Sequence, residues 1–302
     1  MHAGIFSAVA RGEDRRAGLR LRVVEPSAST DAVKLLAAGR ADFAVLDIHD
    51  LALAREKGQD LVGVLALVQR PLAAVLARPG LDHPAELAGR RVGVTGLPSD
   101  DAVLRSVIRG DGGDPRRVRR VTIGFNAVGA LLSGRVAATT GFWNVEGVAL
   151  RRRRPGFAEF RVDAYGAPAY PELVVCVTRR TLRGRSELVR SLRRALARGY
   201  AFTLSRPRES LAHLRRRAPG LDPRLAADQL ATVRPVLTDR GRFGVLEPGR
   251  LRAWARWEVR FGIVRRQPDV ERAFDLPRGG RAEVGAGSGA GDTVGSLGLR
   301  VR

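Results

Sequence analysis

The chain has little of several residue types, and each scarcity excludes a class of structure. Cys176 is the only cysteine, which excludes an internal disulfide and a zinc ribbon. Aromatic residues make up 5% of the chain, and no apolar run approaches the ~20 residues that a membrane-spanning helix needs. The longest candidate, residues 61–68, fits a buried strand. No basic segment followed by an apolar core comes after Met1, so we expect no signal peptide in this chain.

Catalytic motifs are missing as well. The chain has no Gly-x-Ser-x-Gly elbow, no Walker loop and no His-Glu-x-x-His pair. Its four histidines, His2, His49, His83 and His213, show no metal-ligand spacing. We therefore expect no catalytic residues, no metal and no cofactor.

Acidic residues are few beside basic ones, and the formal net charge is +22. All of the 53 basic residues except Lys34 and Lys57 are arginines. They are spread along the chain and are not interleaved with aromatic residues, which a base-stacking surface would need. We expect a positive surface without a deep basic groove, and no nucleic-acid partner.

Strands and helices alternate along the chain, which indicates an α/β protein. Continuous apolar strands such as residues 61–68 are typical of a parallel sheet that is buried on both faces. A second unit begins near Pro71, and a strand over residues 173–177 returns to the first. We predict a discontinuous lobe 1 (1–71 and 176–276) and an inserted lobe 2 (72–175).

The last 26 residues, 277–302, are rich in Gly, Ala, Ser and Arg. They hold too few large apolar side chains to offset the entropy lost on ordering. We predict a disordered tail.

Polar and aromatic residues follow several predicted strands, where open α/β sheets bind their ligands. Examples are His49, Asn126 and the block Trp143–Glu146. Each has an alternative explanation. Asn126 could cap a helix, Trp143 could be core, and Glu146 could be a first-turn charge. Together they favour a ligand site in a cleft.

Several motifs resemble one family. The motifs are His2-Ala-Gly-Ile-Phe6, Asp31-Ala-Val-Lys-Leu-Leu36, Ala38-Gly-Arg-Ala-Asp-Phe43, Gly89-Arg-Arg-Val-Gly93, Gly124-Phe-Asn126 and Gly141-Phe-Trp-Asn-Val-Glu146. They resemble the thiamine-pyrimidine-precursor family, which includes solute-binding proteins for formylaminopyrimidine and hydroxymethylpyrimidine and the fungal pyrimidine synthases. The resemblance implies a type II periplasmic-binding-protein fold with a ligand cleft between two α/β lobes. It also implies an ABC permease and ATPase as partners, an extracytoplasmic location and a monomer.

The resemblance assigns roles to individual residues. His2 would lie at a helix entrance beside the ligand. Trp143 would stack on a flat ring, and Asn144 and Glu146 would bind an exocyclic amine and a ring nitrogen. Further expected ligand-binding residues are His49, Asn126 and Tyr170. Family members have an earlier strand before the counterpart of His2, so a first strand of lobe 1 is expected to be missing here.

Binding is therefore the function expected from the sequence, with a thiamine pyrimidine precursor as ligand and sulfonates, nitrate or flavin precursors as open possibilities. The alternative is a pyrimidine-synthase-like enzyme, because His49 stands where the fungal synthases have the histidine that they consume. Those synthases resemble one another in a cysteine-rich run, where this chain has Cys176 alone. We therefore do not expect an enzyme.

Overall fold

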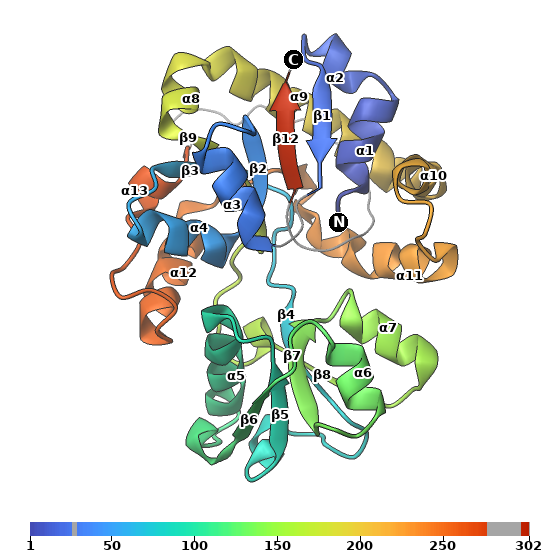
Figure 1. Ribbon diagram of the computed structural model, residues 1–302, viewed down its shortest axis with the longest axis vertical. Helices are drawn as coiled ribbons and strands as arrows, with labels where there is room; N and C mark the ends of the chain where they lie inside the picture. The colour runs from blue at the N-terminus through green and yellow to red at the C-terminus, as the bar shows by residue number, and fades with distance from the viewer. Residues whose placement is uncertain (26–28, 277–296, 302) are drawn as a thin grey trace. The chain divides into compact units, whose positions relative to one another are not determined.

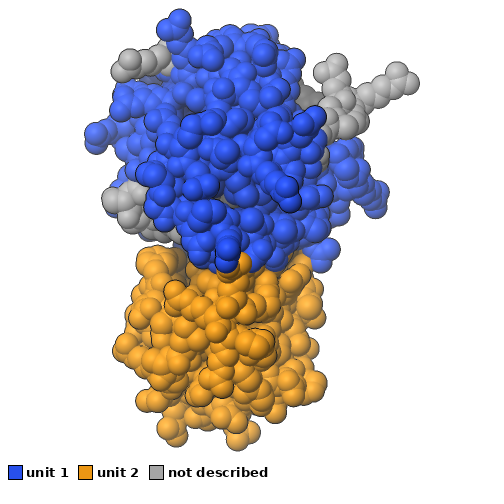
Figure 2. All heavy atoms as spheres, turned by 90° about the vertical axis from the view of Figure 1, so that its right-hand side faces the viewer, with its two compact units in different colours: residues 1–70, 170–255, 266–302 blue, residues 71–169, 256–265 orange. Residues whose placement is uncertain are grey.

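The computed structural model describes residues 1–25, 29–276 and 297–301, which form two compact units (Figure 2). Unit 1 contains residues 1–70, 170–255 and 266–302, and unit 2 contains residues 71–169 and 256–265. No helix in the described ranges is long and apolar enough to cross a membrane.

Residues 256–265, which the sequence analysis placed in lobe 1, belong to unit 2. Two side-chain hydrogen bonds explain this placement. The indole of Trp257 donates to Ser106 Oγ at 3.1 Å, and Arg105 donates to the carbonyl of Phe261. Periodicity alone places Trp257 in a core but does not say in which one.

The sheet of unit 1 has five strands in the order β1-β12-β2-β9-β3 (Figure 1). Their bounds are Leu21–Val24 (β1), Leu297–Val301 (β12), Phe43–Asp47 (β2), Leu173–Thr178 (β9) and Leu61–Ala66 (β3). Every pairing in it is antiparallel. The predicted parallel sheet is therefore wrong here, because β9 lies between β2 and β3 and β12 lies between β1 and β2.

Strand β12 corrects the prediction of a tail disordered throughout. Leu299 is fully buried and Arg300 is exposed, as alternation in a strand requires. The carbonyl of Leu299 accepts from Asp42 N at 2.9 Å, and the amide of Val301 donates to the Asp42 carboxylate at 2.8 Å. The composition averaged over these 26 residues does not reveal that five of them form a strand. Residues 277–296 and 302 of the predicted tail lie outside the described residues.

Replacing Leu299 by aspartate should destabilise unit 1 strongly. The substitution buries a carboxylate between β1 and β2, and an uncompensated buried charge costs about 3–5 kcal/mol. The matched control is Arg300→Asp, a charge change at the neighbouring exposed position. Chemical denaturation would measure both. Equal stabilities of the two variants would contradict the placement of β12.

Helices precede, separate and follow the strands of unit 1 along the chain. They are α1 (Ala3–Ala10), α2 (Glu13–Arg16), α3 (Ser29–Ala37), α4 (Ile48–Glu56), α8 (Arg179–Gly184), α9 (Ser186–Ser205), α10 (Pro207–Arg217), α11 (Pro223–Val233), α12 (Pro248–Arg260, whose last five residues belong to unit 2) and α13 (Val270–Ala273). The 3₁₀ turn η4 (Arg234–Val236) precedes the hairpin β10 (Thr238–Asp239) and β11 (Arg242–Phe243).

Helix α1 packs closely on α9, because small residues face each other. A Cβ on Gly199 would overlap the carbonyl oxygen of Gly4, and a Cβ on Gly4 would overlap the ring of Tyr200. The hydroxyl of Tyr200 donates to the carbonyl of Met1 at 2.8 Å. Helix α9 therefore fixes the start of α1, where His2 lies.

Unit 2 has a five-stranded sheet in the order β6-β5-β7-β4-β8. Its strands are Arg119–Thr122 (β6), Arg91–Val94 (β5), Ala138–Phe142 (β7), Ala73–Ala77 (β4) and Ala158–Arg161 (β8). Its helices are α5 (Pro98–Gly110), α6 (Ala127–Leu132) and α7 (Glu146–Arg153), with the 3₁₀ turns η1 (Pro84–Leu87), η2 (Pro115–Arg117) and η3 (Val162–Ala164). Strands β6, β5 and β7 are parallel, so their carboxyl ends lie at one edge.

Candidate functional site

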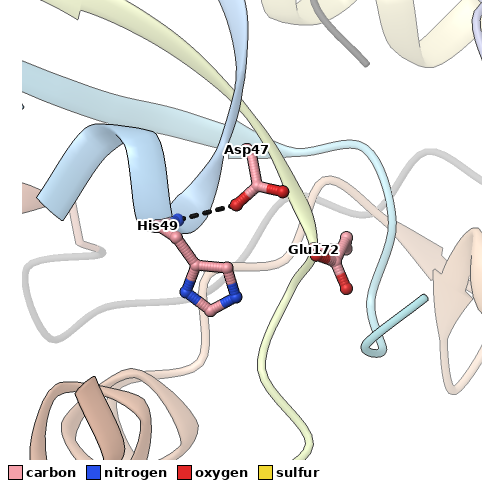
Figure 3. A group of neighbouring side chains, drawn as sticks. All are labelled: Asp47, His49 and Glu172. Carbon is pink, nitrogen blue, oxygen red and sulfur yellow. Dashed lines mark hydrogen bonds between the residues drawn. The ribbon is translucent and has the colours of Figure 1, made fainter. Parts of the chain in front are cut away.

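In unit 1, polar side chains meet where β2 passes into α4 (Figure 3). Asp47 ends β2 and caps α4, because its carboxylate accepts from the amide of His49 at 2.8 Å. His49 is 3% exposed, and its Nε2 lies 3.3 Å from the hydroxyl of Tyr170. The two rings meet edge to face with centroids 5.1 Å apart. The structure thus brings together two of the predicted ligand-binding residues, His49 and Tyr170.

Glu172 belongs to the same group, and the sequence analysis did not single it out. It is 1% exposed, and its carbonyl accepts from Ile48 N at 3.0 Å. One ligand atom from each of Asp47, His49 and Glu172 lies within 4.8 Å of the others. These residues could hold a divalent cation, and they are the only such cluster within the described residues. The expected absence of a metal stays a prediction. A carboxylate two residues after Tyr170, directly before a buried strand, was the signal available in the sequence.

Replacing Asp50 by asparagine should stabilise the protein at alkaline pH and leave it unchanged near pH 4. Burial and the neighbouring Asp47 carboxylate raise the pKa of Asp50 to about 7. A raised pKa means that the folded state binds more protons than the unfolded state between about pH 4 and pH 7. Stability from this group is therefore lost as the pH rises through that window. Thermal unfolding at pH 4 and pH 8 is the measurement, with the exposed Asp82→Asn as control. A similar gain at both pH values would contradict the assignment.

His2 is the third predicted residue in unit 1, and it is almost completely enclosed. It is 1% exposed, and neither ring nitrogen has a hydrogen-bond partner in the part of the chain that the structure describes. Burial, and to a lesser extent the charged N-terminus, lower the pKa of His2 to about 3. The ring is therefore neutral near pH 7 and keeps one donor and one acceptor unused.

In unit 2, Trp143 follows β7 but does not offer an open ring. It is 2% exposed, and its indole donates to the carbonyl of Pro71 at 3.0 Å. The guanidinium of Arg161 lies over the ring, 4.1 Å from its centroid. A ligand could stack on this face only if Arg161 moved. The alternative interpretation of Trp143 as a core residue describes this geometry better.

Asn144 and Glu146, the next two predicted residues, lie at the same edge, Asn144 buried and Glu146 half-buried. Asn144 is fully buried, and neither atom of its amide finds a partner among the described residues. Glu146 accepts from the amide of Phe142 at 2.8 Å. Burial raises the pKa of Glu146, and the charge of Asp100 adds to the effect.

Asn126 differs from these residues because it is exposed. It occupies the N-cap position of α6 but makes no side-chain capping bond. Asn126 therefore stands at the position expected of a helix cap, but its side chain does not form the hydrogen bond of a cap. Its side chain lies over Gly129, where a Cβ would overlap it.

Several arginines gather around one cavity in unit 1. A cavity of about 800 Å³ lies between α9 and the segment 242–248. Five arginines line it, namely Arg190, Arg193, Arg194, Arg198 and Arg242, together with Glu247 and Asp275. Arg193 is engaged, since it donates to the carbonyl of Val64 and to Asp275. Four of these arginines stand on α9 at helical spacing, so the arginines are less evenly spread over unit 1 than their scatter along the sequence suggests.

The sequence profile described as NMT1/THI5-like matches residues 1–210, well over half of the chain. The chain belongs to the NMT1/THI5-like family. The formylaminopyrimidine-binding protein of Halalkalibacterium halodurans is 31% identical over 214 residues, which cover 70% of this chain and 65% of the relative. A 4-amino-5-hydroxymethyl-2-methylpyrimidine phosphate synthase of Legionella pneumophila is 26% identical over 230 residues, which cover 73% and 71%. The family resemblance is confirmed.

Solved structures identify the fold of this NMT1/THI5-like chain. The aliphatic sulphonate binding protein SsuA of Escherichia coli superimposes with a TM-score of 0.73 at 15% identity, over 94% of this chain and 92% of that chain. The alkanesulfonate-binding protein SsuA of Xanthomonas axonopodis pv. citri gives 0.70 at 18% identity, over 92% and 95%. The predicted type II periplasmic-binding-protein fold is confirmed.

Proposed function

We propose that this protein is the substrate-binding component of an ABC importer and that its ligand is a thiamine pyrimidine precursor. The observation that carries the proposal is that two of the expected ligand-binding residues, His2 and Asn144, are buried with polar atoms that no described residue pairs. Leaving a buried donor or acceptor unpaired costs about 1–3 kcal/mol, so such groups call for a partner. A ligand that carries ring nitrogens and an amine would provide one.

The chemistry of these side chains fits an amino-pyrimidine. The amide of Asn144 offers both a donor and an acceptor, and the carboxylate of Glu146 accepts from an exocyclic amine when it is ionised. The neutral ring of His2 offers one of each. An alkyl sulfonate would instead require several hydrogen-bond donors, and it would offer no donor to the acceptor oxygens of Asn144 and Glu146. The 31% identity to a formylaminopyrimidine-binding protein points to the same ligand class.

We assign the ligand contacts to two sets, His2, His49 and Tyr170 in unit 1 and Asn126, Asn144 and Glu146 in unit 2. The partners proposed for the protein are an ABC permease and its ATPase. We propose that it works outside the cytoplasm, as a monomer, and that it does not bind nucleic acid.

The enzymatic alternative rests on His49, which is buried beside Tyr170 and within reach of the Asp47 and Glu172 carboxylates. A synthase that consumes this histidine would change the mass of its own chain. A binding protein returns both ligand and chain unchanged. Intact-mass measurement with peptide mapping, on the chain incubated in a cell extract that supplies the co-substrate of a pyrimidine synthase, therefore separates the two functions, and a mass change at His49 would establish the enzyme.

The test of binding is a thermal-shift screen followed by calorimetry with formylaminopyrimidine, hydroxymethylpyrimidine, riboflavin and ethanesulfonate. A ligand at 100 times its Kd stabilises the folded state by ~2.7 kcal/mol, which raises the midpoint by several degrees. We expect the two pyrimidines to give the largest shifts. A shift with ethanesulfonate alone would refute the pyrimidine assignment.

A further inference from the structure

Phe125 is the only aromatic side chain among the large apolar ones that the described residues expose. It is 79% exposed, whereas the two others, Leu132 and Val259, are 37% and 36% exposed. Moving a phenyl ring out of water is favourable, so such a high exposure in a folded unit is unfavourable by itself. The ring is therefore available to a planar partner.

The backbone around Phe125 presents it outward at the end of β6. Gly124 has φ +57°, a left-handed conformation that glycine adopts without strain. The amide of Asn126 donates to the carbonyl of Ile123 at 3.4 Å and closes a turn, after which α6 begins. Phe125 lies at the tip of this turn, between a strand and a helix that both fix its position.

Phe125, Asn144 and Glu146 all follow strands that end at the same edge of the unit 2 sheet. Strands β6, β5 and β7 are neighbours and run parallel, so the end of β6 is two strand spacings, roughly 10 Å, from the end of β7. Stacked aromatic rings have centroids ~4.5–7 Å apart. A heteroaromatic ring stacked on Phe125 would therefore extend the contact surface toward Asn144 and Glu146, which follow β7.

Trp143 does not offer such a surface. Its ring is 2% exposed, with Arg161 over its face. We propose that Phe125, in place of Trp143, supplies the ring on which the ligand stacks, and that it thereby selects flat heteroaromatic ligands over aliphatic anions. This inference rests on the proposed function.

The test is calorimetry with formylaminopyrimidine on the full chain and on Phe125→Leu, which keeps an apolar side chain but removes the π-system. We expect Phe125→Leu to bind about tenfold more weakly or worse, within the range for stacking of a base on an aromatic residue. Phe125→Trp, which keeps a ring, should bind within about threefold of the parent. The stack should also lower the ultraviolet absorbance of the bound pyrimidine in the parent and in Phe125→Trp but not in Phe125→Leu.

The control is Leu132→Ala, which removes another exposed apolar side chain in the same unit from the far end of α6. It should leave affinity unchanged. Ligand-free unfolding midpoints of both Phe125 variants should match the parent, since Phe125 is mostly in water. If Phe125→Leu binds as tightly as the parent, the inference is wrong while the proposed function stands. If the parent binds neither pyrimidine, both are wrong.

Discussion

Replacing Glu146 by glutamine should weaken binding of the pyrimidine ligand by about 10–100-fold and raise the unfolding midpoint of the ligand-free protein at neutral pH. The first effect follows from the loss of a charged acceptor, since a hydrogen bond to a charged group contributes about 1.5–3 kcal/mol. Glutamine keeps an oxygen that can accept from the amide of Phe142, so the local fold should persist.

The second effect follows from the raised pKa of Glu146, whose main cause is burial of the carboxylate. The stability that this group contributes is fully present below its ordinary pKa, where it is protonated in both states. It is lost as the pH rises through the higher folded-state pKa. Glutamine carries no charge at any pH and avoids this loss. Ligand affinity has the opposite pH dependence, because recognition of an amine needs the ionised carboxylate and should weaken on acidification.

Calorimetry at pH 7.5 and thermal unfolding at pH 4 and pH 7.5 measure the two effects. The matched control is Glu209→Gln, an exposed carboxylate whose side chain keeps 58% of its surface in water. It should change neither quantity. Undiminished affinity of Glu146→Gln would remove Glu146 from the ligand site, and the raised midpoint alone would then mark it as a buried structural charge.

Gly199→Val should destabilise unit 1 by about 3 kcal/mol or more. Its side chain would overlap the carbonyl of Gly4 and crowd Ala8, and a backbone atom cannot turn aside as a flexible side chain can. Valine in place of glycine improves helix propensity by a few tenths of a kcal/mol, which the overlap far exceeds. Because α9 positions α1, His2 should shift as well, and ligand affinity should fall together with stability.

A helical glycine with open space around it provides the control. Gly184, at the end of α8, has no positive φ, and a Cβ added to it would meet no atom within 4 Å. Gly184→Val should therefore leave stability within about 0.5 kcal/mol of the parent. Denaturant unfolding of both variants is the measurement. Similar stabilities for Gly199→Val and Gly184→Val would contradict the close packing of α1 on α9.

Local patterns in the sequence were sufficient to predict most individual helices and strands. The apolar stripe of α9, with Val189, Leu192 and Leu196 buried, follows from helical spacing. The strand ends that carry Asn144 and Glu146 were found because the chemistry of a site requires polar groups where a buried strand stops.

Pairings between distant segments needed the tertiary structure. Strand β9 alternates in direction with β2 and β3, and β12 joins the sheet from the other end of the chain. Trp257 packs in unit 2 because Ser106 accepts its indole hydrogen. A run of apolar residues indicates that a segment is buried, but it does not indicate which strand or helix packs against that segment.

The sequence by itself determined the fold class, the family and the candidate residues for a ligand site, because periodicity and residue chemistry are local properties. Only the tertiary structure decided which of those residues are available. It covers Trp143 with Arg161, exposes Phe125, and leaves the amide of Asn144 without a partner among the described residues. Exposure depends on what packs against a side chain, and that neighbour comes from another part of the chain, such as Arg161 at the end of β8.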